Sequence, residues 1–244
     1  MFSLFFTAKK FLLDLLFPIV CLGCGVAETY LCAACFAKIP LQESFVCPGW
    51  LTPSFENAVC AACRKKVKID GLIAASFYDS ALLRRLIFAY KYKFVKPLAV
   101  PLAQLILKAI AAHAYSLFHR GDLVLIATPL SKRRERWRGF NQAGEIARIL
   151  ANTLSLPLAG DVLLRTRDTL PQVETESRQE RLDNLAGAFR VADPGIVKNK
   201  AILLVDDIAT SLATFNECAK ILKSSGAREV WGLAVAREYF KKVS

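Results

Sequence analysis

The sequence predicts an α/β protein in which a small cysteine-rich module precedes a parallel sheet flanked by helices. Seven of the eight cysteines lie between positions 21 and 63, an uneven distribution that core packing does not produce. Beyond residue 70, short apolar runs typical of strands alternate with apolar residues at helical spacing. The 244 residues suffice for one full-size domain and a small one, and we expect the cysteine-rich module at residues 1–68 and the α/β domain at residues 69–244.

The composition is that of a basic globular protein. Lys and Arg number 33 against 21 Asp and Glu, which leaves a formal net charge of +12. Such a charge favours a polyanionic partner, namely nucleic acid, a phosphorylated ligand or an anionic membrane surface, and the alternative is a basic but inert surface. With 54% hydrophobic residues and only 12 Gly and 10 Pro, disordered and collagen-like classes are excluded.

The first residues predict a docking helix. Apolar positions in residues 2–17 fit a helix with one apolar face. Lys9, Lys10 and Asp14 interrupt the apolar pattern, and the uncharged stretch is far shorter than the roughly 20 residues of a membrane span. No small-residue cleavage site precedes Cys21, so an export signal is not indicated. We expect a cytoplasmic protein without a transmembrane segment, with attachment of this helix to a membrane surface as the alternative.

Two cysteine pairs predict a zinc site in a zinc-ribbon-like module. Two Cys-x2-Cys knuckles separated by seven residues can aim four thiolates at one point, which is the tetrahedral arrangement that Zn²⁺ prefers. The four ligands would be Cys21, Cys24, Cys32 and Cys35. A segment this small buries little core, so metal binding would supply its folding free energy. A disulfide-bonded secreted module is the alternative, but nothing else in the chain indicates export.

A second cysteine group is incomplete. Trp50 stands where the knuckle that begins at Cys47 would have its second cysteine, and Cys60-x2-Cys63 follows as an intact knuckle. Three thiolates can hold zinc with a borrowed ligand, but neither of the two histidines is near in sequence. A second site at Cys47, Cys60 and Cys63 therefore stays open.

The remaining chain predicts a doubly covered sheet. The expected strands are 71–78, 123–127, 162–165, 201–205 and 229–236, and the expected helices are 80–89, 98–118, 141–154 and 213–224. Pro97 and Pro101 lie at the start of the second helix, and Gly226 closes the last one. Strands separated by helices imply a parallel sheet with helices on both faces, where ligands bind outside the carboxyl ends of the strands.

One of these strand ends carries two acids. Asp206 and Asp207 follow the buried strand 201–205 directly, although adjacent carboxylates cost desolvation and mutual repulsion. Vicinal ribose hydroxyls or a Mg²⁺ shell would explain them. The hydroxyls that follow, together with the amides entering the next helix, would suit a phosphate. The alternative is a strand-end turn in which an Asp only caps the helix.

Residues 205–214, VDDIATSLAT, are similar to the phosphoribosyl-diphosphate (PRPP) motif of type I phosphoribosyltransferases. The resemblance implies a type I phosphoribosyltransferase-like sheet in which Asp206 and Asp207 hold ribose hydroxyls and PRPP binds with Mg²⁺. The loop that would cradle the 5′-phosphate comprises Thr210, Ser211, Leu212, Ala213 and Thr214. That family usually has Gly where this chain has Leu212, whose side chain restricts the backbone. If active, the chain would transfer a phosphoribosyl group; no catalytic residue is indicated.

Three more stretches, residues 83–92, 129–143 and 172–184, resemble the ComF family of competence-associated proteins, which includes the GntX-like proteins. Residues 138–143, RGFNQA, are the most specific piece, and the resemblance covers almost the whole chain in the right order. It implies a cytoplasmic protein that handles incoming single-stranded DNA during natural transformation. The alternatives are a metabolic phosphoribosyltransferase and a zinc-dependent adaptor for a DNA-uptake helicase or channel component.

A basic segment follows the strand 123–127. Residues 131–138 place five cations around one acid. The guanidinium group of Arg can donate two parallel hydrogen bonds to phosphate oxygens. The resemblance assigns this position to the diphosphate loop, and Trp137 could stack on a base. The residues expected to contact diphosphate or nucleic acid are Lys132, Arg133, Arg134, Arg136, Arg138 and Gly139. Residues 91–96 also interleave cations with aromatics, as single-strand binders do. The alternative for residues 131–138 is a solvated charged loop, and the alternative for residues 91–96 is that Tyr92 and Phe94 face the core.

Overall fold

The computed structural model describes residues 18–43, 46–49, 52–54, 57–113, 115–118, 121–167 and 185–238. The expected helix at residues 2–17, Trp50 and the ComF-like stretch 172–184 lie outside the described residues. Within the described part of the chain, no helix combines the length and the apolar character that crossing a membrane requires.

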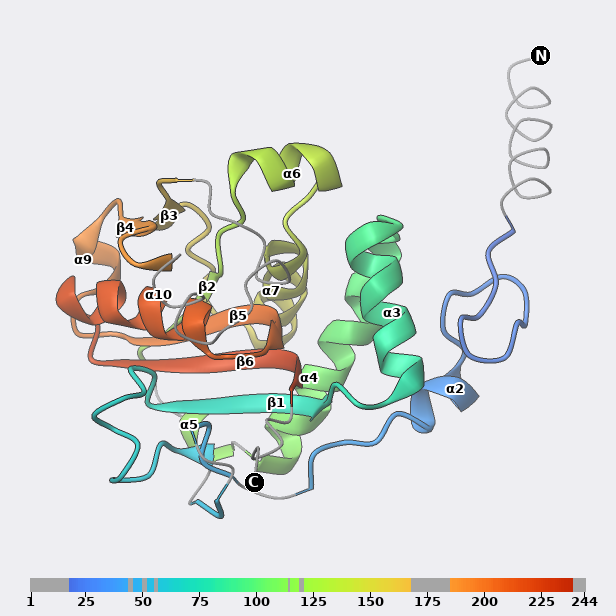
Figure 1. Cartoon of the computed structure of the whole chain (residues 1–244), viewed down its shortest axis with the longest axis horizontal. Helices are drawn as coiled ribbons and strands as arrows, with labels where there is room; N and C mark the ends of the chain where they lie inside the picture. Colours follow the sequence, from blue (N-terminus) through green and yellow to red (C-terminus); the bar gives the residue numbers. More distant parts are fainter. Residues whose placement is uncertain are drawn as a thin grey trace.

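A four-stranded parallel sheet forms the centre of the molecule (Figure 1). Its strands, in spatial order, are β1 (Gly71–Phe77), β6 (Glu229–Arg237), β5 (Ala201–Ala209) and β2 (Leu123–Ala127). Leu203 of β5 pairs with Trp231 on one side and Leu125 on the other. The predicted parallel sheet is confirmed, and β5 continues four residues beyond the predicted end, so that the two acids lie inside the strand.

Both faces of the sheet are covered by helices, as predicted. Helices α3 (Ala81–Tyr92), α4 (Ala99–His113) and α7 (Gln142–Leu154) contribute to one core, and α10 (Ala213–Ser224) contributes to the other. Successive residues of β5 alternate between the two cores: Leu203 faces the first, while Ile202 and Leu204 face the second. A strand buried on both faces has to be apolar throughout, which explains the uninterrupted run before the acids.

Shorter elements connect these layers. They are α2 (Ala33–Ala37), η2 (Lys96–Leu98), α5 (Tyr115–Phe118), α6 (Lys132–Arg138), α9 (Pro194–Val197) and a two-stranded ribbon of β3 (Leu163–Arg165) with β4 (Phe189–Val191). The strand expected at 162–165 thus belongs to a separate antiparallel ribbon and not to the main sheet. The helix expected at 98–118 is described as two helices, α4 and α5.

The basic segment, expected as a loop, is the helix α6. Ser131 caps its start by accepting a hydrogen bond at Oγ from the Arg134 amide (3.4 Å), and Gly139 ends it with φ +76°. Lys, Arg and Glu favour helices, so a capped run of these residues forms one turn after another. The helix fixes the backbone positions from which its cations extend.

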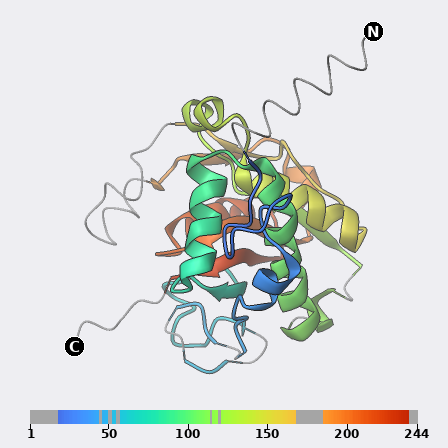
Figure 2. The same ribbon diagram turned by 90° about the vertical axis from the view of Figure 1, so that its right-hand side faces the viewer.

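The cysteine-rich segment packs against both cores. Leu22, Leu31 and Phe36 pack on the core that contains α3 and α4, and Figure 2 shows this segment in front of these two helices. Cys47 and Cys63 belong to the core on the other face. The first cysteine group thus lies in a segment that packs on one core, whereas the second group contributes to the other core, and the division near residue 68 stays a prediction.

Candidate functional site

Asp206 and Asp207 lie at the carboxyl edge of the sheet, where the sequence predicts a ligand site. Strand β2 ends one residue earlier, since its last residue Ala127 pairs with Val205. The Asp207 amide donates to Asp206 Oδ1 (2.8 Å), and the Thr128 hydroxyl also bonds to the Asp206 carboxylate. Asp206 therefore lies between β6, where it pairs with Ala234, and the residue that follows β2.

The acid pair is short of positive charge. Burial, and then the charge of Asp207, raise the pKa of Asp206 to about 7, while Lys91 and the bonds from the Asp207 amide and Thr128 act in the opposite direction. A carboxyl with such a pKa readily keeps a proton near neutral pH. A cation or a set of hydroxyl donors would favour the ionised form, so the pair suits either ligand.

Lys91 at the end of α3 supplies one cation to the pair. Its Nζ lies 2.8 Å from Asp207 Oδ1, and the side chains of Lys91 and Asp207 are only 18% and 8% exposed. An ion pair this shielded from water is screened little by salt. The sequence placed Lys91 in a ComF-like stretch but not beside the acids, because no local pattern links residues 116 positions apart.

The loop after β5 turns with strain at one position. Leu212, at the cap of α10, has φ +61°, a conformation that costs roughly 1–2 kcal/mol for a residue with a Cβ. Its side chain is 4% exposed and joins the second core, a burial that contributes about 1.5–3 kcal/mol. Leu212 thus points away from the loop, and its left-handed backbone is one that Gly would adopt without this cost.

The other loop residues surround the entry to α10. Ser211 is buried, and its Oγ accepts from the Ala213 amide (3.4 Å). Thr210 and Thr214 are half-buried and remain close to the surface. The structure therefore gathers the acid pair and all five predicted phosphate-loop residues in one continuous stretch at the carboxyl edge.

The RGFNQA stretch joins α6, the end of β2, α7 and α3. Asn141 caps α7 by accepting from the Gly144 amide (3.3 Å), and its Nδ2 donates to the Thr128 carbonyl (3.0 Å) beside the acid pair. Arg138 donates to Gln142 Oε1 (2.9 Å), and the Tyr90 hydroxyl donates to the Gln142 carbonyl (2.8 Å). Burial, and then nearby acids, raise the pKa of Tyr90 far above its usual range, so it stays a donor.

The cations of α6 differ in exposure. Lys132, Arg133 and Arg136 are exposed, whereas Arg134 and Arg138 are half-buried. A surface hollow of about 390 Å³ is lined by Lys132, Glu135, Arg136 and Gly139. The predicted basic cluster is thus one helix with an open cationic side, next to the strand end that carries the acid pair.

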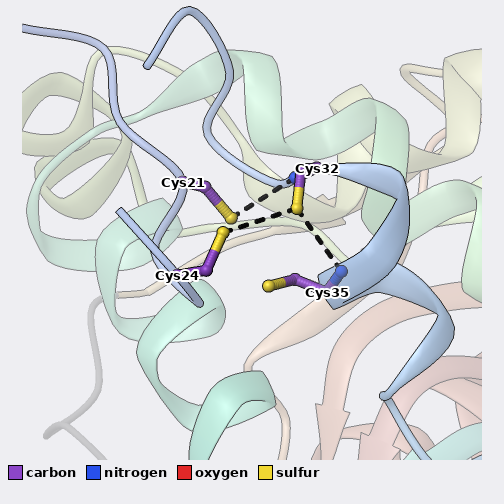
Figure 3. A group of neighbouring side chains, drawn as sticks. All are labelled: Cys21, Cys24, Cys32 and Cys35. Carbon is purple, nitrogen blue, oxygen red and sulfur yellow. Dashed lines mark hydrogen bonds between the residues drawn. The ribbon is translucent and has the colours of Figure 1, made fainter. Parts of the chain in front are cut away.

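Four cysteines meet in front of α3 and α4 (Figure 3). The Sγ atoms of Cys21, Cys24, Cys32 and Cys35 all lie within 4.8 Å of one another. Cys24 Sγ and Cys32 Sγ are 3.6 Å apart, close to the roughly 3.8 Å that Zn–S bonds of about 2.3 Å give between ligands of a tetrahedral zinc. A Cβ on Gly23 would stand 2.4 Å from Cys35 Sγ, so only glycine leaves room for the cluster.

The chemistry of the four thiols also fits a metal. Burial alone would raise the pKa of Cys21, but hydrogen bonds from the backbone of Cys32, Cys24 and Gly23 lower it to about 6. Burial and the neighbouring sulfurs raise the pKa of Cys35 to about 12. Four thiolates so close together ionise only around a cation. All eight cysteines lie in the described part of the chain, and none forms a disulfide.

The second group has three sulfurs. The Sγ atoms of Cys47, Cys60 and Cys63 lie within 4.8 Å of one another, and the Cys60 amide donates to Cys47 Sγ (3.3 Å). A Cβ on Gly49 would be 2.8 Å from Cys63 Sγ, which repeats the close turn of the first group. These residues could supply three ligands of a metal.

Comparison with known proteins identifies the family. No protein-family model matches the chain. It is 30% identical over 210 residues to DNA utilization protein YhgH of Salmonella typhimurium, covering 83% of this chain and 89% of the relative. The chain belongs to the ComF/YhgH family. Competence protein F of Haemophilus influenzae is 29% identical over 223 residues (86% of this chain, 93% of the relative), and competence protein ComFC of Bacillus subtilis is 26% identical over 208 residues (80% and 78%).

The ComF resemblance of the sequence is thereby confirmed. Among solved structures, a purine phosphoribosyltransferase from Pyrococcus horikoshii shares 15% identity and covers 59% of this chain and 93% of its own length, with a TM-score of 0.33. A TM-score this low adds nothing to the topology described above.

We predict that Asp206→Asn stabilises the protein, and more so as the pH rises. The folded-state pKa of Asp206, about 7, exceeds its ordinary value of 3.8, so ionisation lowers stability as pH rises from about 4 through 7. Asn keeps an oxygen for the Asp207 amide but cannot ionise. Thermal unfolding between pH 4 and pH 8 measures the difference.

Asp122→Asn is the matched control with the opposite sign. The hydrogen bond and charge of Arg228 lower the pKa of Asp122, so this carboxylate stabilises the fold above its unfolded pKa and its loss lowers the unfolding temperature at neutral pH. An Asp206→Asn effect that is the same at every pH contradicts the account of the pair.

Proposed function

We propose that this protein handles incoming single-stranded DNA during natural transformation and binds a phosphorylated ribose, such as that of PRPP, at Asp206 and Asp207. The names of its relatives, competence protein F and DNA utilization protein YhgH, support a role with DNA. The single observation that carries the proposal is α6, an exposed basic helix joined by Asn141 and Thr128 to the strand end that holds the acid pair. We expect phosphates on α6 and a ribose phosphate at the pair.

The pocket works through charge balance in this proposal. Asp206 and Asp207 accept hydrogen bonds from two vicinal hydroxyls, and Mg²⁺, where bound with PRPP, would neutralise the diphosphate charge. Lys91 neutralises Asp207 and is free to turn toward a phosphate once the hydroxyls bind. Residues 210–214, with the amides at the start of α10, receive the 5′-phosphate. The same pocket would serve a metabolic phosphoribosyltransferase, which requires an acceptor and release of diphosphate.

Zinc has a structural role in this proposal. Cys21, Cys24, Cys32 and Cys35 hold one Zn²⁺, and the segment they close packs on α3 and α4, with Lys108 Nζ 4.6 Å from the ring centre of Phe36. Zinc therefore braces the helix that carries Lys91. The group of Cys47, Cys60 and Cys63 is the candidate for a second ion.

We also propose a cytoplasmic location, with the segment 2–17 as a docking element. Its partner would be a DNA-uptake helicase, a channel component or the membrane surface. An adaptor role of this kind is compatible with DNA binding, because the segment precedes the cysteine group in the sequence, whereas the cations proposed to contact DNA are on α6.

We predict that neutralising the exposed side of α6 weakens binding of single-stranded DNA. Lys132→Gln, Arg133→Gln and Arg136→Gln together remove three cations, which should lower affinity for an oligothymidine at least about tenfold and make the slope of log K against log salt shallower by about 2. Fluorescence anisotropy at several salt concentrations measures both. A matched variant, Lys65→Gln with Lys198→Gln and Lys200→Gln, removes the same charge elsewhere. Equal losses in the two variants would mean that only net charge matters.

We predict that Cys24→Ser lowers the zinc content by one ion per chain and lowers the unfolding temperature, because a structural zinc supplies folding free energy. Elemental analysis of the purified protein measures the content. Cys218→Ala, in the core and outside both groups, should keep all zinc. Cys63→Ser tests the second group in the same way: if the zinc content of this variant also falls, the second group binds zinc. If Cys24→Ser keeps the full zinc content, the first cysteine group does not bind zinc.

A further inference from the structure

Four large aromatic side chains are exposed together on α3, α6 and the segment between α3 and η2. Phe88, Tyr92, Phe94 and Trp137 are 51%, 41%, 39% and 58% exposed. Single exposed aromatics are common, but a group contributed by two helices and a loop is a surface feature. We call these four residues the ring strip.

The rings contact one another in sequence across the two helices. Ring centres are 5.1 Å apart for Phe88 and Tyr92, 6.3 Å for Tyr92 and Trp137, and 5.3 Å for Phe94 and Trp137. Phe94 has φ +56°, a left-handed backbone that is a genuine outlier for so bulky a residue. This left-handed residue ends α3, where the Lys93 and Val95 amides both donate to the Ala89 carbonyl (3.1 and 3.2 Å), and the turn leaves the Phe94 ring edge-on to Trp137. The strip is thus a built surface.

Cations border the ring strip. The Arg138 guanidinium lies 5.6 Å from the ring centre of Tyr92 and 5.9 Å from that of Trp137, and Gln142 holds it there. Its Nε is buried and has no hydrogen-bond partner among the described residues. Residues 81–96 contain no acid, and Lys93 and Arg133 are exposed nearby in the chain. Positive charge around exposed rings is complementary to a polyanion that carries flat apolar groups.

We propose that the ring strip stacks the bases of single-stranded DNA while the surrounding cations contact its phosphates. This assignment rests on the proposed single-strand binding and gives it a site. Aromatic side chains stack on every base, so the contact needs no particular sequence, as suits DNA taken up from outside. Lys91 and Tyr92 are neighbours on α3, the first paired with Asp207 and the second in the strip. The strand therefore passes beside the ribose phosphate pocket.

The test compares an oligothymidine with an abasic oligomer of the same length. Phe94→Ala with Trp137→Ala should weaken oligothymidine binding about tenfold or more per ring lost, leave abasic binding unchanged and keep the salt slope, because no cation is removed. Phe94→Tyr with Trp137→Phe keeps two rings and should restore most of the affinity. Val100→Ala with Ile196→Ala removes two other exposed apolar side chains and should change nothing.

The outcomes separate this site from the proposed function. Salt-sensitive oligothymidine binding that the Ala variant retains in full overturns the ring strip and leaves single-strand binding intact. Equal loss for the oligothymidine and the abasic oligomer also overturns stacking. Failure of the unaltered protein to bind either oligomer overturns both proposals. If the Ala variant loses binding to anionic phospholipid vesicles and keeps binding to DNA, the strip is a membrane contact and not a base platform.

Discussion

Two adjacent carboxylates inside a buried strand are the constraint on which the rest of the structure depends. Asp206 and Asp207 end the apolar run of β5, and the fold has to supply positive charge at that point. Lys91 supplies it from α3, which must therefore stand at the carboxyl edge of the sheet. The cysteine-rich segment packs on the same core as α3. The packing of the first cysteine group, the position of α3 and the charge around the acid pair are thereby linked.

The RGFNQA stretch is the second organising feature, and its specificity has a structural reason. Gly139 ends α6, Asn141 begins α7 and holds the end of β2, and Gln142 bonds to both Arg138 and Tyr90. Each of these residues contacts a different element, so few other side chains could serve. The result is one block that contains the basic helix, the ring strip and the edge of the acid pair. A DNA strand and a phosphorylated ribose would meet within it.

Local patterns were enough to predict the sheet, the acid pair and the first cysteine group. The apolar run at 201–205 and the Cys-x2-Cys knuckles can each be recognised from residues adjacent in the sequence. In the structure the run is part of β5, and the four sulfurs of the first group lie within 4.8 Å of one another. The pairing of Lys91 with Asp207 depends on packing of distant elements and leaves no local signal. The sequence indicated Trp137 and residues 91–96 as candidates for base stacking, but the contacts that join Tyr92, Phe94 and Trp137 into one strip depend on how α3 and α6 pack and leave no local signal. The sequence also could not show where the Leu212 side chain points, because that depends on the left-handed backbone conformation of this residue.

The central claim is that the acid pair and the loop after it form a working ribose phosphate pocket. Calorimetric titration of the zinc-loaded protein with PRPP and Mg²⁺ tests it most directly, with the Asp206→Asn, Asp207→Asn double variant as the comparison. The account predicts saturable binding to the intact protein, in which the carboxylates of Asp206 and Asp207 hold the ribose hydroxyls. The double variant lacks both carboxylates and should lose this binding. No binding by the intact protein, or equal binding by both, would contradict the claim and leave α6, the ring strip and the metal groups to carry the function.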